Sequence, residues 1–115
     1  AEMLKVNSEL RYLELGMNNI GDAGASAIGP ALTHNKALTT LWLGSNGIGN
    51  SGAKALAISV QQNDHLMHLM VEDNPFDDHQ AHAEMDKAVT KNRRGAYPEG
   101  EPGADAPSSN AKVEL

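Results

Sequence analysis

Cysteine is absent from this sequence of 115 residues, and aromatic side chains are scarce: one Trp, two Tyr and one Phe. A chain without cysteine has no disulfide framework and no thiolate to act as nucleophile or metal ligand. With so few aromatic residues, the core must be built from Leu, Ile, Val, Ala and Met side chains. The length suits a single domain.

Long hydrophobic runs and an excess of positive charge are also missing. No apolar stretch approaches the roughly 20 residues of a membrane-spanning helix, and the sequence shows no signal-peptide or Asn-x-Ser/Thr pattern. The formal net charge is −6, from 15 acidic residues against 9 Lys and Arg, which disfavours binding to nucleic acid or to anionic membranes. We therefore predict an intracellular, cytoplasmic protein that binds neither nucleic acid nor membrane.

Patterns typical of enzymes are missing as well. No Ser lies in a nucleophile-elbow motif, and no glycine-rich segment is followed by the Lys-Ser/Thr of a phosphate loop. We predict no enzymatic activity, no catalytic residue and no cofactor. His79 and His82, with Asp78 and Asp86 four residues on either side of His82, could form only a weak surface metal site. A solvated helix face is the better interpretation, so we predict no bound metal.

What the sequence does contain is an internal repeat. Leu10, Leu38 and Leu66 are spaced 28 residues apart, and the pattern around them moves with the same period and without insertions. The matching positions are Leu10, Leu13, Leu15, Asn18 and Ile20, then Leu38, Leu41, Leu43, Asn46 and Ile48, then Leu66, Leu69, Val71, Asn74 and Phe76. Further along, Gly21, Gly24, Ala25, Ile28, Leu32 and Asn35 match Gly49, Gly52, Ala53, Leu56, Val60 and Asn63.

Each unit has the pattern of a strand, a turn and a helix. Leu13 and Leu15 are two residues apart, so they lie on one face of an extended segment. Ala25, Ile28 and Leu32 have the spacings of three and four that predict one helical face. The Asn after each strand lies at a turn, where its amide can bond backbone groups that would otherwise lack partners. The predicted structural ladder consists of Asn18, Asn46 and Asn74.

The motif L-x-x-L-x-L-x-x-N-x-I-G-x-x-G-A runs from Leu10 to Ala25 and again from Leu38 to Ala53. It resembles the ribonuclease-inhibitor-like subfamily of leucine-rich repeat proteins, and the resemblance covers about residues 3–92. The resemblance implies an α/β fold, a short solenoid or horseshoe segment with parallel strands on the concave face and helices on the convex face. It also implies binding to another protein, commonly through the concave face.

The repeats set the expected domain boundaries. Residues 1–94 are predicted to form the array: 1–9 end a preceding repeat or cap the N-terminus, 10–37 and 38–65 are full repeats, and 66–94 form a degenerate capping repeat. The Pro- and Gly-rich residues 95–115 are predicted to form a flexible tail.

Two local departures from the repeat affect the predicted structure of the last helix and of the first helix. In the last unit, Gln80 and Glu84 stand where the earlier units have Gly and an apolar residue. We therefore expect that helix to bury a different set of positions from the earlier helices, namely Ala81, Met85, Ala88 and Val89. Pro30 falls inside the first helix and removes the bond to the carbonyl of Ser26, so we expect a kink or a frayed end there.

Strand alternation turns every second strand residue away from the core and toward the concave face. Because neighbouring strands lie about 4.8 Å apart, these residues form rows, with Trp42 beside Met70 and near Tyr12. An outward Trp is the kind of anchor that dominates binding energies, and Gly16 and Gly44 leave space next to it. The alternative is that Trp42 only covers its own sheet. The predicted partner-binding residues are Tyr12, Glu14, Thr40, Trp42, His68, Met70 and Glu72.

Two functions fit this pattern. The first is a non-catalytic scaffold or protein–protein interaction module that binds a partner protein on the concave strand face. The alternative is a structural subunit of a larger multiprotein assembly, held by its tail and flanks.

The last four residues, Lys112 to Leu115, loosely resemble a retrieval signal or a peptide that adds a strand to a PDZ-type groove. An unremarkable chain end is the better interpretation of them.

Overall fold

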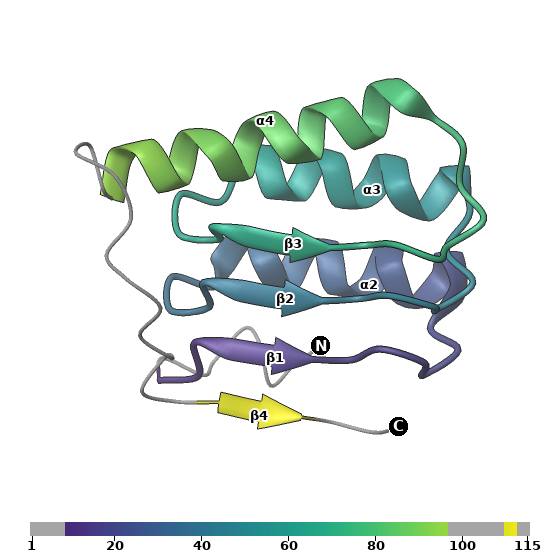
Figure 1. The fold of residues 1–115 in the computed structure, drawn as a ribbon, viewed down its shortest axis with the longest axis horizontal. Helices are drawn as coiled ribbons and strands as arrows, with labels where there is room; N and C mark the ends of the chain where they lie inside the picture. Colours follow the sequence, from purple (N-terminus) through teal and green to yellow (C-terminus); the bar gives the residue numbers. More distant parts are fainter. Residues whose placement is uncertain (1–8, 97–109, 113–115) are drawn as a thin grey trace.

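Strands and helices alternate along the chain in the computed structural model, which describes residues 9–96 and 110–112 (Figure 1). Three short strands are each followed by a longer helix. In order, the elements are β1 (Tyr12–Glu14), α2 (Gly21–His34), β2 (Thr40–Trp42), α3 (Asn50–Gln61), β3 (His68–Met70), α4 (His79–Ala96) and β4 (Asn110–Lys112). The described helices include none long and apolar enough to cross a membrane.

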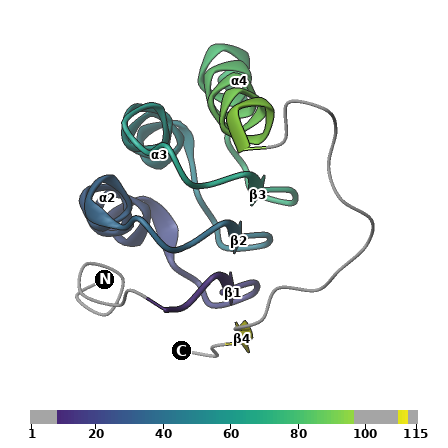
Figure 2. The same cartoon turned by 90° about the vertical axis from the view of Figure 1, so that its left-hand side faces the viewer.

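The strands form one open sheet in the order β3-β2-β1-β4, and every neighbouring pair is parallel. Tyr12 pairs with Thr40, and Thr40 pairs with His68, so each step across the sheet is one 28-residue period. Figure 2 shows the helices fanned out along one side of this sheet. The α/β solenoid predicted from the repeat is therefore confirmed, with parallel strands in one layer and helices in the other.

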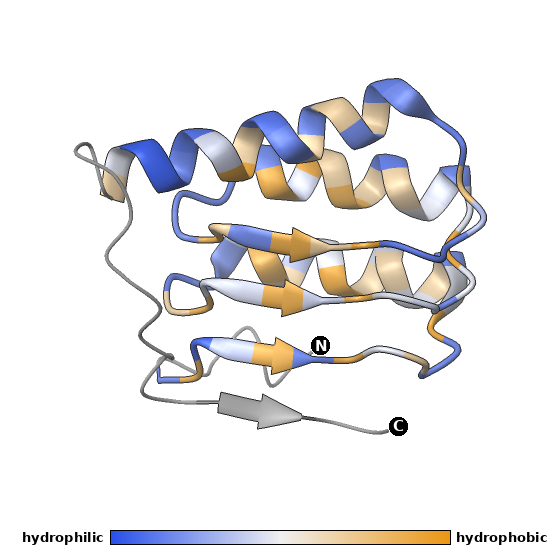
Figure 3. Ribbon diagram, in the orientation of Figure 1, coloured by the Kyte–Doolittle hydropathy of each residue, from blue (hydrophilic) through white to orange (hydrophobic). Residues whose placement is uncertain are grey.

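The core lies between these two layers. Leu13 and Leu41 have no exposed surface, and on the described helices the apolar residues gather on the side that faces the sheet (Figure 3). The fully buried large side chains are Leu13, Leu32, Leu38, Leu41, Leu43, Ile48, Leu56, Leu66, Val60 and Asn46. All of them occupy positions of the repeat, because no single unit can bury its own apolar face and stacked units can.

The last helix turns the predicted stripe inward. Ala81, Met85, Ala88 and Val89 are all buried, which confirms the shifted phase. Asp78 precedes the helix, and its Oδ1 accepts a hydrogen bond of 3.0 Å from the backbone N–H of Ala81. This is an N-cap bond. The helix continues to Ala96, two residues beyond the expected end of the array.

Pro30 does not interrupt the first helix. We expected a kink or a frayed end, and α2 instead runs without a break from Gly21 to His34. Pro30 lies on the exposed side of α2, and so does Ser26, whose carbonyl loses its helical donor. Water can reach a carbonyl on that side, which lowers the cost of the missing bond.

The tail also differs in part from the expectation. Residues 95 and 96 belong to α4, and residues 110–112 form β4 against the outer edge of β1. A parallel strand therefore stands within a segment for which we expected no regular structure. The expected cap over residues 1–9 falls almost wholly on residues 1–8, outside the described residues, as do residues 97–109 and 113–115.

Candidate functional site

Six outward strand residues come together in two rows on the concave side of the sheet. Glu14 pairs with Trp42 and Trp42 with Met70 in one row, while Thr40 stands between Tyr12 and His68 in the other. We call this set the strand-face patch; it consists of Tyr12, Glu14, Thr40, Trp42, His68 and Met70.

Exposure within the strand-face patch is uneven. Five of its members are half-buried, whereas Thr40, which was predicted to contact a partner, is buried, with 7% of its surface exposed. Glu72, the seventh predicted residue, is exposed beyond the end of β3. Thr40 therefore has little surface left to offer a partner.

Trp42 is held in place by a neighbouring glycine. A Cβ atom added to Gly44 would lie 2.8 Å from Nε1 of Trp42, closer than real contacts allow. The indole thus lies close to the backbone of Gly44, and it is half-buried. At Gly16, one repeat earlier, an added Cβ would meet only the carbonyl of Gly44 at 3.5 Å. Trp42 covers part of its own sheet and still presents an accessible face.

Asn46 lies in the turn between β2 and α3 and is almost fully buried, with 1% of its surface exposed. Its side chain joins two successive units through five backbone groups. Oδ1 accepts from the N–H of Asn18 at 2.8 Å and of Ile20 at 3.3 Å, and Nδ2 donates to the carbonyls of Leu15 at 2.9 Å, Leu43 at 3.0 Å and Gly44 at 3.2 Å.

Asn74 repeats this arrangement one period later. It accepts from the N–H of Asn46 at 2.8 Å and of Ile48 at 3.1 Å, and it donates to the carbonyls of Leu43, Val71 and Glu72. The turn amides therefore bond across the boundaries between units, as well as within them.

A family model described as leucine-rich repeat matches residues 6–29 and 34–57 of this chain. These two segments contain the first two strands and most of the first two helices, in the register that the structure shows. The chain is a leucine-rich repeat protein. The finer assignment to the ribonuclease-inhibitor-like subfamily stays a prediction.

A solved structure shares the fold of this chain. A structure titled "Leiomodin-1 Actin-Binding Site 2 (ABS2)" matches with a TM-score of 0.65 and 20% identity, over 85% of this chain and 72% of that one. A tropomodulin C-terminal domain from Caenorhabditis elegans is more distant, with a TM-score of 0.39 and 11% identity, over 84% of this chain and 93% of that one. No curated protein sequence matches the chain.

A second asparagine ladder joins the leucine-rich repeats at the other end of the helices. Asn63 donates through Nδ2 to the carbonyls of Leu32 at 2.6 Å and Asn35 at 3.0 Å. Asn92 donates to the carbonyls of Asn63 at 2.7 Å and Leu66 at 2.8 Å. The repeat indicated Asn35 and Asn63, but Asn92 escaped notice because it stands 29 residues after Asn63 and not 28.

Polar residues at the helix starts provide a third connection between repeats, which the sequence analysis missed. Oδ1 of Asp22 accepts from the backbone N–H of Gly49 at 2.7 Å and of Gly52 at 2.9 Å, so the first turn of α2 caps the start of α3. In the next repeat, Oδ1 of Asn50 accepts from the N–H of Asp77 at 2.9 Å and of Asp78 at 3.1 Å. The signal was the recurrence of Asp22, Asn50 and Asp78 every 28 residues, all of types that cap helices.

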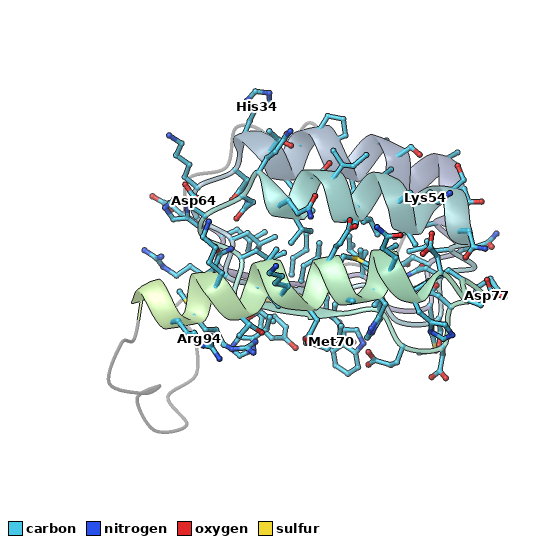
Figure 4. The ribbon with its side chains drawn as sticks, turned by 90° about the horizontal axis from the view of Figure 1, so that it is seen from above. His34, Lys54, Asp64, Met70, Asp77 and Arg94 are labelled. Atoms are coloured by element: carbon cyan, nitrogen blue, oxygen red, sulfur yellow. The ribbon has the colours of Figure 1, made fainter. Side chains whose placement is uncertain are left out.

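Acidic and basic residues line different rims of the repeat array. Asp77 and Arg94 lie at opposite ends of α4 (Figure 4). A groove of about 420 Å³ at the strand ends is lined by Glu72, Asp73, Asp77 and Asp78, with Leu69, Met70 and Phe76. A groove at the opposite rim is lined by Arg11, Lys36 and Lys91. Acidic groups near helix starts and basic groups near helix ends both complement the helix dipoles.

The two histidines of α4 do not gather further ligands. Within the part of the chain that the structure describes, no group of three or more His, Asp or Glu side chains could hold a metal ion. The ring of His82 instead lies beside that of Phe76, with centroids 6.2 Å apart. Both histidines are exposed.

Proposed function

We propose that this leucine-rich repeat protein is a non-catalytic interaction module that binds a partner protein on the strand-face patch. The observation that carries the proposal is the position of Trp42, half-buried between Glu14 and Met70 and held by Gly44. An aromatic side chain whose pose is already fixed loses little conformational entropy when a partner covers it. Such residues tend to be the hot spots of interfaces.

The surroundings of Trp42 suggest the chemistry of the partner. Glu14 flanks it in the same row, and Glu72 is exposed beyond Met70. A partner segment with an apolar side chain next to Lys or Arg would match an indole bordered by carboxylates. Three strands offer a small patch, so we expect modest affinity that falls as the salt concentration rises.

The test compares Trp42→Ala with Ile58→Ala. Ile58 is a matched control, because it is a large apolar residue on α3 and 58% exposed, far from the strand face. Actin is the first probe, because the leiomodin-1 fragment with this fold is titled an actin-binding site. Partners captured from cell extract by the wild-type chain, and identified by mass spectrometry, are the further probes.

We expect Trp42→Ala to weaken binding of the identified partner at least tenfold, with an unchanged circular dichroism spectrum, and Ile58→Ala to leave the affinity within twofold. Equal affinities for the wild-type chain and Trp42→Ala would refute the strand-face proposal.

We also propose an intracellular location, in keeping with the absence of cysteine. Imaging of the tagged chain in its source cell would check it.

A second candidate is a structural subunit held in a larger assembly by its tail and flanks. The pairing of β4 with β1 favours it, because it shows that the tail contains a segment able to join a sheet. Deleting residues 97–115 leaves α4 whole and should abolish incorporation into an assembly under this function. Under the strand-face proposal, the same deletion should leave partner binding in place.

A further inference from the structure

The outer edge of β1 is filled by a segment from the far end of the chain. β4 (Asn110–Lys112) pairs with it in parallel, with Asn110 opposite Tyr12, Ala111 opposite Leu13 and Lys112 opposite Glu14. Each of these partners stands 98 positions further along the chain, yet the strand takes the position and direction that the strand of a neighbouring repeat would take (Figure 1).

The hydrogen bonds between β1 and β2 determine which groups of β1 face that outer edge. Toward β2, the carbonyl of Arg11 accepts from Thr40 and the N–H of Leu15 donates to Trp42, so the odd-numbered residues bond on that side. Because bonding residues alternate in a parallel ladder, the N–H and C=O groups of Tyr12 and Glu14 face the outer edge. Ala111, opposite Leu13, is the residue of β4 placed between them.

We propose that the outer edge of β1 is a strand-binding site for an extended segment in parallel orientation, and that its occupant is the chain's own C-terminal segment around Ala111. An unpaired edge presents a row of N–H and C=O groups that other strands can join. The occupied edge is therefore closed to pairing, and the segment that fills it is tethered to the far end of the array. The edge uses the backbone groups of Tyr12 and Glu14, whereas the strand-face patch uses their side chains, so the proposal does not rest on the proposed function.

The tether determines when a second copy can supply the strand. Thirteen residues connect α4 to β4, and a short tether gives an effective concentration of the order of millimolar. At micromolar protein concentration the chain's own segment therefore occupies the edge. The same segment of a second copy replaces it in a substantial fraction of molecules only as the protein concentration approaches millimolar.

Amide hydrogen exchange of the full-length chain tests the site within one molecule. Ala111→Pro removes the N–H placed to bond the edge, whereas Asn110→Pro, the matched control, removes one that points away from it. We expect the Glu14 amide to exchange at least tenfold faster in Ala111→Pro than in the wild-type chain, and at the wild-type rate in Asn110→Pro. The Leu15 amide, bonded to Trp42 at 2.8 Å, should stay protected in all three. A Glu14 amide as fast in the wild-type chain as in Ala111→Pro would overturn the proposal.

Single cysteine substitutions test whether the segment of a second copy can occupy the edge, since the wild-type chain has no cysteine. Glu14→Cys and Lys112→Cys occupy paired positions, whereas Ala111→Cys pairs with Leu13 and is one residue out of register with Glu14. Mixing Glu14→Cys with Lys112→Cys under oxidation should give a mixed disulfide-linked dimer that increases with concentration up to millimolar. Mixing Glu14→Cys with Ala111→Cys should give at least fivefold less. Equal yields from the two mixtures would show random collision and overturn the register.

Discussion

Replacing Asn46 by Ala should be among the most destabilising single changes in this protein. The side-chain amide of Asn46 bonds five backbone groups that belong to two successive repeats, and only 1% of its surface is exposed. After the change, the N–H groups of Asn18 and Ile20 lose the acceptor that Asn46 provided. The carbonyls of Leu15, Leu43 and Gly44 each keep another donor, namely Nδ2 of Asn18, Nδ2 of Asn74 and the N–H of Met17. Water cannot easily take that place in a position so deeply buried.

The size of the effect follows from the number of groups left unsatisfied. A buried donor or acceptor that loses its partner costs about 1 to 3 kcal/mol. This penalty applies to the N–H groups of Asn18 and Ile20, and less to Ile20, whose bond is the longer at 3.3 Å. Each of the three carbonyls loses only one of two donors, a net hydrogen bond of about 1 kcal/mol at most, and partial relaxation reduces the sum. We expect the free energy of unfolding to fall by about 3 to 5 kcal/mol, a large share of the 5 to 15 kcal/mol typical of a whole domain.

Urea unfolding measures this loss, with circular dichroism and Trp42 fluorescence as independent probes. For a slope of about 1 to 3 kcal/mol per molar, the midpoint should fall by more than 1 M. Asn74→Ala is the comparison, because Asn74 makes the same number of bonds from a half-buried position. Water can replace more of its bonds, so the loss there should be about half as large. Equal losses for the two variants would refute the argument from burial.

Three further changes have expected outcomes of their own. Asp22→Ala removes the cap of α3 and should cost about 1 kcal/mol, seen as a fall of several degrees in Tm by calorimetry, whereas Asp22→Asn should retain most of that stability. Gly44→Ala should displace the indole of Trp42 and shift its fluorescence maximum, and Gly16→Ala should not; equal spectra would contradict the proposed contact. Asn92→Ala leaves two buried carbonyls without their donor and should cost about 1 to 3 kcal/mol in urea unfolding; a loss below 0.5 kcal/mol would show that water replaces the amide.

Most of the fold could be predicted because residues at equivalent positions of successive repeats pack in equivalent ways. Leu13 and Leu41 must be identical in role since they pair in the sheet one period apart, and the same translation brings each helix beside the next. The polar connections between repeats were harder to predict. Asp22 is exposed and carries no apolar pattern, so only its recurrence with Asn50 marks it, and that recurrence does not reveal that the cap acts on the following helix.

The last repeat and the tail show where periodicity stops being informative. In α4, Glu84 stands at the position of the buried Leu56, so Met85, equivalent to Ala57, supplies the large buried side chain, and the closing amide moves to Asn92. A helix with no described repeat stacked beyond it need not keep a strict 28-residue register. β4 could not be predicted at all: three residues in a Pro- and Gly-rich segment have no periodic signal, and their strand exists only because the edge of β1 pairs with them.

Most positions of each repeat are needed for stability, and this limits which positions can change to bind a partner. The inward strand residues form the core, the turn asparagines bond successive repeats, and Asp22 and its equivalent join helix starts; changes at any of these positions reduce stability. The outward strand positions make the fewest such contacts, and three of them in one row already differ completely, as Glu14, Trp42 and Met70. Where the repeat is otherwise kept so strictly, free variation in that row is what a surface shaped by its partner would show. Exchanging Trp42 for Glu, its equivalent in the first repeat, should therefore change partner binding while the unfolding midpoint moves by less than about 0.5 M.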